Sequence, residues 1–114
     1  MRVLVCGGRK FSDYQLLAQT LDALHCQRAF SLLIHGAARG ADTLAHEWAE
    51  KNGILINWYR ADWNKYKKAA GPIRNTRMLT EGKPQLVVAF KGGDGTADMI
   101  AQAHAALVMV KVIE

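Results

Sequence analysis

Three glycine-rich segments of this chain have the composition of anion-binding loops. They are Gly7-Gly8-Arg9-Lys10, Gly36-Ala37-Ala38-Arg39-Gly40 and Lys91-Gly92-Gly93-Asp94-Gly95-Thr96. A glycine-rich turn lets backbone N–H groups come close to an anion, and a helix that follows the turn adds the positive end of its dipole. The same glycines would also serve simple tight turns, so one loop alone does not decide between the two roles.

Charged side chains accompany these loops. Arg9, Arg39 and Arg74 could neutralise a bound anion, because a guanidinium group grips an oxyanion through paired hydrogen bonds. Asp42 and Asp98 act against this, since both are expected in first helical turns, where a carboxylate satisfies the helix dipole and repels a phosphate. The charges by themselves leave both roles of the loops open.

A long connection over residues 59–71 contains Asp62 and Trp63. Connections of this length often form lids over binding sites. Trp63 could stack on a nucleobase, or it could anchor the connection to the core. Arg74 and Arg77, three residues apart on the next predicted helix, share a face, either as a solvated basic stripe or with Arg74 directed at a phosphate.

The composition limits the class of protein. At 114 residues and 12.6 kDa, the chain is expected to form one domain over residues 1–114. Its net charge of +5 favours anionic partners such as nucleotides or nucleic acid. No segment is apolar enough for a membrane span, and a strand pattern begins directly after Met1, so we expect neither a membrane anchor nor a signal peptide.

Cysteines and histidines give no sign of a metal site. Cys6 and Cys26 lack the spacing of a metal or redox centre, and we expect both to be buried, reduced thiols of a cytoplasmic protein. The four histidines are scattered over separate predicted elements, so no metal is predicted. Asp42 and His46 lie one helical turn apart and could pair locally.

Apolar runs and helical periodicities alternate along the chain. Strands are predicted over residues 2–6, 30–35, 54–59, 85–90 and 107–113. Helices are predicted after a Ser12 cap with Gln15 at the capping-box position, over residues 42–51, from Pro72 through Leu79, and over residues 96–106. Each strand is a continuous apolar run, which is typical of a parallel sheet that is covered on both faces.

The expected fold is a single α/β, Rossmann-like domain with a parallel five-stranded sheet in the order 3-2-1-4-5 and helices on both faces. Right-handed crossovers leave few other topologies. In this order the winding reverses between strands 1 and 4, and ligands of such sheets bind in the crevice there, beyond the carboxyl ends of the strands. All three glycine loops fall on that edge of the sheet, and their convergence favours ligand binding over simple turns.

Several motifs resemble one family along nearly the whole chain. The segments VCGGRKFSD, IHGAARGADTLAHEWA, RADW, AGPIRNTRML and VVAFKGGDGTADM resemble YspA-type proteins of the SLOG superfamily. GGDGT is similar to the PGGxGT signature of the LOG phosphoribohydrolases, which release cytokinin bases from nucleoside monophosphates. HGAARGADTLAH is similar to a segment of the DNA-processing family that binds single-stranded DNA. The resemblance implies a nucleotide or nucleotide-derived ligand in the crevice.

One departure from the LOG pattern concerns catalysis. The LOG signature continues to a glutamate that carries the glycosidic chemistry, and the matching position here is Met99. A thioether cannot act as a general base. The arginine motif RxxxM is present from Arg74 to Met78, so the resemblance implies that the phosphate-holding arginine is kept and the catalytic carboxylate is missing.

The sequence predicts a nucleotide-binding protein that acts as a ligand sensor or accessory module, self-associates, and needs no cofactor. Two alternatives remain: a single-stranded nucleic-acid module, and a nucleotide-processing enzyme whose carboxylate would come from Asp42, Asp62, Asp94 or Asp98. The predicted ligand-binding residues are Gly7, Gly8, Arg9, Gly36, Arg39, Gly40, Asp42, Asp62, Trp63, Arg74, Asn75, Gly92, Gly93, Gly95 and Thr96.

Overall fold

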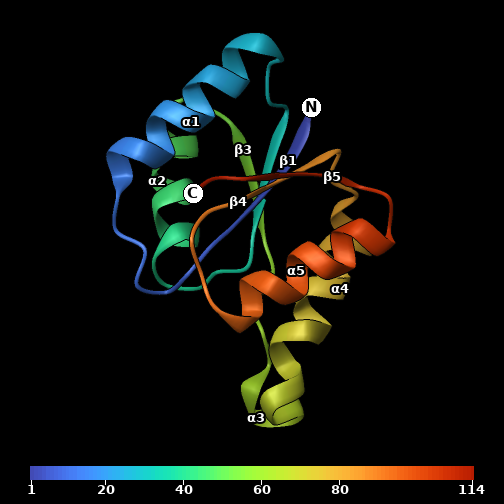
Figure 1. Cartoon of the computed structure of the whole chain (residues 1–114). Helices are drawn as coiled ribbons and strands as arrows, with labels where there is room; N and C mark the ends of the chain where they lie inside the picture. Colours follow the sequence, from blue (N-terminus) through green and yellow to red (C-terminus); the bar gives the residue numbers. More distant parts are fainter.

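Five parallel strands form one sheet in the order β3-β2-β1-β4-β5 (Figure 1). The computed structural model describes residues 1–114, the whole chain. The strands are β1 (Arg2–Cys6), β2 (Leu32–His35), β3 (Leu55–Trp58), β4 (Leu86–Ala89) and β5 (Met109–Val112). The order and the parallel pairing confirm the predicted Rossmann-like α/β fold.

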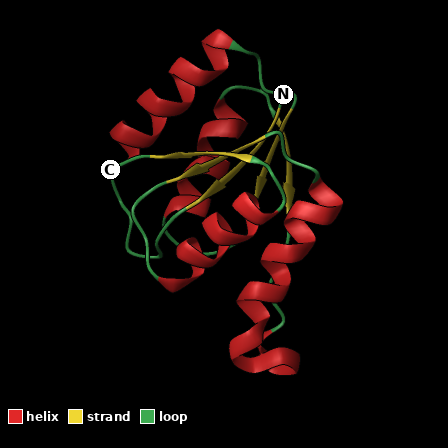
Figure 2. Ribbon diagram, turned by 45° about the vertical axis from the view of Figure 1, so that its right-hand side comes forward, coloured by secondary structure: helices red, strands yellow, loops and turns green.

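Helices cover both faces of the sheet (Figure 2). The helices are α1 (Tyr14–Gln27), α2 (Ala41–Lys51), α3 (Trp63–Tyr66), α4 (Ala70–Gly82) and α5 (Asp94–Ala105), with a 3₁₀ turn over Lys67–Ala69. Successive residues of a strand point to opposite faces. Val3 and Val5 of β1 therefore pack with α1 and α2, whereas Leu4 and Cys6 pack with α4 and α5. Both faces are buried, which explains why the strands are continuous apolar runs.

Several predicted boundaries of the helices were wrong. The cap of α1 is Asp13 and not Ser12, and its side chain accepts the N–H of Leu16 at 3.0 Å. Helix α4 begins at Ala70, so Pro72 lies inside its first turn, where a missing N–H costs no helical hydrogen bond. The connection predicted over residues 59–71 contains α3 and the 3₁₀ turn.

The two cysteines differ in their burial. Cys6 is buried as predicted, but Cys26 is exposed, so the expectation of two buried thiols was wrong for Cys26.

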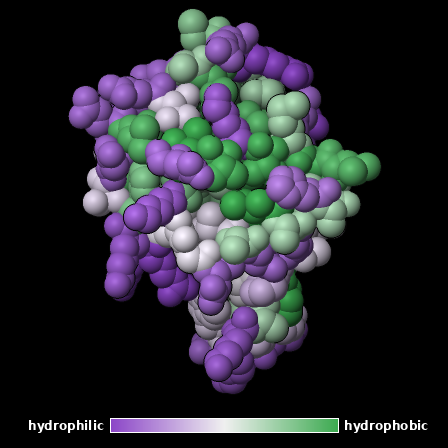
Figure 3. All heavy atoms as spheres, in the orientation of Figure 1, coloured by the Kyte–Doolittle hydropathy of each residue, from purple (hydrophilic) through white to green (hydrophobic).

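Apolar surface gathers around the edge strand β5, where Met109 and Val112, together with the preceding Leu107, are exposed (Figure 3). None of the helices combines the length and the apolarity that crossing a bilayer requires.

The register of the sheet determines where the loops lie. β1 is central and pairs with β2 on one side and with β4 on the other, Val3 beside Leu33 and Cys6 beside Ala89. The carboxyl ends of these three strands are therefore neighbours. The loops that follow them, which contain the three glycine-rich segments, meet at one edge of the sheet.

Candidate ligand site

The three glycine loops are fastened to one another through their backbones. Gly8 donates its N–H to the carbonyl oxygen of Lys91 at 2.9 Å and accepts the N–H of Ala41 at 3.2 Å. A Cβ on Gly8 would lie 3.0 Å from the Cα of Gly92, and one on Gly40 would overlap the carbonyl oxygen of Gly8. Gly8 and Gly40 thus allow the loops to pack closely, and the N–H of Gly8 is already bonded within the protein.

The start of α5 has a different character, because its N–H groups are free. The first hydrogen bond of the helix runs from Ala97 to the carbonyl oxygen of Gly93 at 3.0 Å, and the N–H groups of Asp94, Gly95 and Thr96 donate to no protein atom. A Cβ on Gly93 or Gly95 would meet nothing within 4 Å. These glycines leave the N-terminus of α5 open to an incoming group.

The hydroxyl of Thr96 adds a donor at the same place. Thr96 is only 8% exposed, yet its Oγ1 takes part in none of the hydrogen bonds of the molecule. No fully buried side-chain oxygen or nitrogen lacks a partner. The Thr96 hydroxyl therefore keeps some accessible surface, and because Thr96 lines the adjoining cavity, the hydroxyl is a candidate donor to a ligand.

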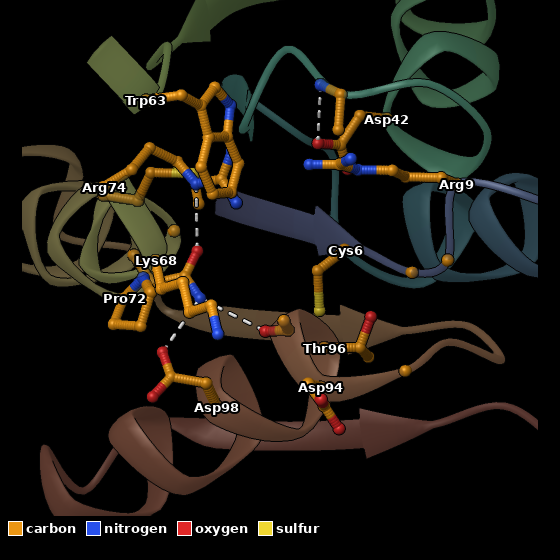
Figure 4. A pocket seen from close by; sticks show the side chains of 18 residues that line it. Cys6, Arg9, Asp42, Trp63, Lys68, Pro72, Arg74, Asp94, Thr96 and Asp98 are labelled. Carbon is orange, nitrogen blue, oxygen red and sulfur yellow. Dashed lines mark hydrogen bonds between the residues drawn. The ribbon is translucent and has the colours of Figure 1, made fainter. Parts of the chain in front are cut away.

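That cavity has a volume of about 460 Å³ and is the candidate ligand site (Figure 4). Figure 4 shows Trp63 and Arg74 on one side of it and Thr96 on the α5 side. The predicted residues that line it are Gly7, Gly8, Arg9, Asp42, Trp63, Arg74, Asn75, Gly93, Gly95 and Thr96. It is also lined by Cys6, Ala38, Lys68, Gly71, Pro72, Met78, Asp94 and Asp98, which were not in the predicted set.

The remaining predicted residues lie elsewhere. Gly36 and Arg39 line a neighbouring groove, and Asp62 lines a separate hollow, where it also caps α3 by accepting the N–H of Lys65. Gly40 and Gly92 line none of these three spaces. Their part in the structure is the packing between loops. Among the missed residues, Lys68 belongs to a short helical segment that has no periodic signal in the sequence.

Arg74 bridges α4 and the loop after β2. Its Nη1 donates to the carbonyl oxygen of Gly36 at 2.7 Å, and its Nε donates to Oδ1 of Asn75 at 3.1 Å. Burial lowers the pKa of Arg74, an effect that the nearby Asp42 carboxylate opposes. Arg74 is thus a structural tie as well as a positive group in the wall of the cavity.

Asn75 ties α4 to the beginning of α5. Its side chain is buried and donates to the carbonyl oxygen of Gly95 at 3.2 Å and to Oδ2 of Asp98 at 3.0 Å. The same carboxylate oxygen of Asp98 accepts the side-chain N–H of Gln102 at 2.8 Å. Asn75 therefore holds the open N-terminus of α5 in place and supplies a hydrogen-bond donor to the Asp98 carboxylate.

Asp42 is a buried carboxylate with one free oxygen. Its Oδ2 accepts the N–H groups of Gly36 at 3.0 Å and Ala38 at 3.2 Å, which shapes the loop after β2. Oδ1 has no partner, and because no fully buried polar atom is unpaired, it keeps some accessible surface in a residue that lines the cavity. Burial raises the pKa of Asp42 to about 6. Asp42 does not pair with His46 as expected, because Nδ1 of His46 lies 2.9 Å from Nε2 of His35.

Trp63 lies at the rim of the cavity and is 46% exposed. It belongs to neither apolar cluster of the core. The guanidinium carbon of Arg9 lies 5.2 Å from the centre of its ring, within the range of a cation–π interaction. The structure therefore does not show Trp63 as an anchor to the core, which was one of the two roles considered for it.

Two side chains that could be read as catalytic are not available for catalysis. Met99, which occupies the glutamate position of the LOG signature, is fully buried in the core beside Leu4 and Val87, whereas its neighbour Asp98 faces the cavity. Cys6 lines the cavity, but burial raises the pKa of its thiol to about 12, so the thiol stays protonated at neutral pH.

Comparison with known proteins agrees with the resemblance seen in the motifs. Residues 1–66 match the model of the YspA, cpYpsA-related SLOG family, a segment that runs from β1 to α3. The chain belongs to this family. It is also 37% identical over 87 residues to the Gene 61 protein of Mycobacterium phage D29, which covers 71% of this chain and 70% of the phage protein. Membership of the SLOG family points to nucleotide-related binding or processing, consistent with the free donors of α5.

Proposed function

We propose that the protein binds a nucleotide or nucleotide-derived ligand in this cavity and acts as a ligand sensor or accessory module. The observation that carries the proposal is the group of unused donors at the start of α5. The N–H groups of Asp94, Gly95 and Thr96 and the hydroxyl of Thr96 adjoin one cavity. Free donors at the positive end of a helix suit the oxygens of a phosphate.

The walls of the cavity support the same assignment. Arg9, Lys68 and Arg74 supply positive charge, and the half-exposed ring of Trp63 offers a surface for a base. The volume of about 460 Å³ lies in the range of small-molecule sites. The carboxylates of Asp42, Asp94 and Asp98 are the opposing charges, so the two arginines and the lysine have to compensate for them.

Calorimetric titration of AMP tests the proposal. Thr96→Val keeps the shape of the side chain and removes the hydroxyl, and we expect affinity to fall about tenfold. Thr80→Val is the matched control, since Thr80 is exposed on α4 and outside the cavity, and it should bind like wild type. If neither AMP nor any other common nucleotide binds the wild type, the proposal is wrong.

Gly93→Val examines the open end of α5 separately. Because a Cβ at Gly93 meets nothing within 4 Å, the fold should tolerate the change. The larger side chain would nevertheless stand where a phosphate must approach the N–H groups, so binding should be lost at an unchanged melting temperature. Unchanged AMP affinity in this variant would place the binding site elsewhere.

A nucleotide-processing enzyme is the second candidate, and Asp42 is the observation that favours it. A carboxylate with a free oxygen in a cavity and a pKa of about 6 has the properties of a general base. Incubation with AMP, followed by chromatography of free adenine, tests this role. Release that Asp42→Asn abolishes would make the protein an enzyme, whereas no release would leave the binding role.

A further inference from the structure

A basic groove lies beside the cavity, and the proposed binding of a nucleotide at α5 does not use it. Its volume is about 630 Å³, and its charged lining residues are Arg9, Lys10, Arg39, Arg60 and Arg74. No carboxylate lies among the residues that line it. A hollow lined by several cations and no acid attracts anions, with the Asp42 carboxylate behind it offsetting part of the charge of Arg74.

The cations of the groove have no ionic partners in the protein. The ion pairs of the molecule are His46 with Glu50 and Arg77 with Glu81, and neither pair lies in the groove. Arg9 and Arg74 are close enough for their charges to repel each other. An anion between them would relieve this repulsion and would form charge-assisted hydrogen bonds.

The groove and the cavity adjoin each other and share part of their walls. Arg9, Ala38, Trp63 and Arg74 line both spaces, so the ring of Trp63 stands at their junction. The free N–H groups of α5 belong to the cavity alone, and Arg39 and Arg60 belong to the groove and not to the cavity. The two adjoining spaces thus hold anion-binding groups at two separate places, with the ring of Trp63 at their border.

A nucleoside monophosphate such as AMP would satisfy only one of these places. With its phosphate at α5, it has no second phosphate to offer to Arg39 and Arg60. A ligand with two nucleotide units can place one phosphate at α5 and another in the groove, with a base against Trp63.

We propose that the basic groove is a second phosphate subsite and that the preferred ligand is a dinucleotide that spans the cavity and the groove. This inference rests on the proposed function, since it assigns the first phosphate to α5. It goes further by naming the size of the ligand and the residues, Arg39 and Arg60, that select it. A long single strand is the competing occupant and is an outcome of the test below.

The experiment compares AMP, the linear dinucleotide pApA and an adenylate octamer by calorimetry at constant ionic strength. The variants are Arg39→Gln/Arg60→Gln in the groove, Thr96→Val in the cavity, and Arg28→Gln/Lys111→Gln as a control. The control removes the same number of charges outside both spaces. Wild type should bind pApA about tenfold to a hundredfold more tightly than AMP, and the octamer no more tightly than pApA.

The groove variant should lose this preference and keep its affinity for AMP, whereas Thr96→Val should weaken both ligands and the control neither. Equal affinities of wild type for AMP and pApA, or a preference that survives in the groove variant, would overturn the dinucleotide proposal and leave AMP binding in place. Affinity that keeps rising up to the octamer would overturn it in favour of a nucleic-acid strand.

Inorganic tripolyphosphate separates this inference from the proposed function, because it has neither base nor sugar. If no nucleotide binds but tripolyphosphate binds in a manner that requires Arg39 and Arg60, the proposed function fails and the groove stands as an anion site. If tripolyphosphate binds the groove variant as well as it binds wild type, the second subsite is wrong.

Discussion

The backbone of Gly40 passes so close to the carbonyl oxygen of Gly8 that no side chain fits between the two residues. Gly40 has a φ of 77° and a ψ of −123°, a conformation that glycine adopts far more readily than other residues. The contact joins the loops after β1 and β2. These loops carry much of the wall of the candidate site, so its shape depends on this contact.

Gly40→Ala should therefore destabilise the protein by about 2–5 kcal/mol, the sum of a strained backbone and of overpacking. Gly53→Ala is the matched control, because Gly53 also has a positive φ, 66°, but a Cβ there meets nothing within 4 Å. It should cost only about 1–2 kcal/mol. Urea denaturation of the two variants measures the difference, and equal losses would show that the loops do not constrain each other.

Arg74→Ala should lower the stability of the unliganded protein by about 1–3 kcal/mol, since it leaves the carbonyl oxygen of buried Gly36 without its donor. Arg77→Ala, three residues further along α4, removes only an exposed pair with Glu81 and should cost less stability than Arg74→Ala. Thermal melts of the two variants provide the comparison. A smaller shift for Arg74→Ala than for Arg77→Ala would mean that the bond to Gly36 contributes nothing to the fold.

Met99→Glu should destabilise the protein by several kcal/mol, on the order of 3 or more, because the position is fully buried among apolar side chains. Met99→Leu conserves the volume and should cost less than about 1.5 kcal/mol. The glutamate variant should gain no adenine release from AMP, since the side chain points into the core. Denaturation midpoints and adenine assays of both variants check this, and a stable, active glutamate variant would contradict the observed direction of residue 99.

The fold was accessible from the sequence because the apolar runs and the glycines that end them are local signals. Strand β1 has the predicted bounds, and the predicted edge of the sheet carries the glycine loops. Helix α3 was missed because its four residues, Trp63–Tyr66, are too few to show a helical period. Asp13 and Ser12 are both good cap residues, and only the geometry of the turn selects Asp13.

The details of the site depend on contacts between distant segments, which the sequence does not display. Counting along the LOG signature leads to Met99, but the phase of α5 turns Asp98, and not Met99, toward the cavity. Arg60 has no motif around it and enters the basic groove only because the loop after β3 reaches the same edge of the sheet. The glycine loops suggested backbone donors in general, whereas the N–H of Gly8 is used internally.

His35 and Asp42 give the protein two opposing responses to pH. Burial, together with His46 and Arg74, lowers the pKa of His35 to about 4, so the folded state resists its protonation. The contribution of His35 to the free energy of unfolding is therefore at its full value above the unfolded pKa of about 6.5. It decreases as the pH falls from 6.5 toward 4. Burial raises the pKa of Asp42 to about 6, so the folded state takes up this proton first and gains stability as the pH falls from about 6 to 4.

In the wild type these two contributions should largely cancel between pH 6.5 and 4, and single variants should reveal each of them. Relative to wild type, Asp42→Asn should lose up to about 3 kcal/mol over this interval, because the loss at His35 is no longer offset. His35→Asn, whose side-chain oxygen can still accept the N–H of Ala37, should gain a similar amount relative to wild type. Urea denaturation at several pH values from 4 to 7.5 measures the three curves, and the contributions of all other groups cancel in the differences. Three parallel curves would mean that neither group is perturbed by its burial.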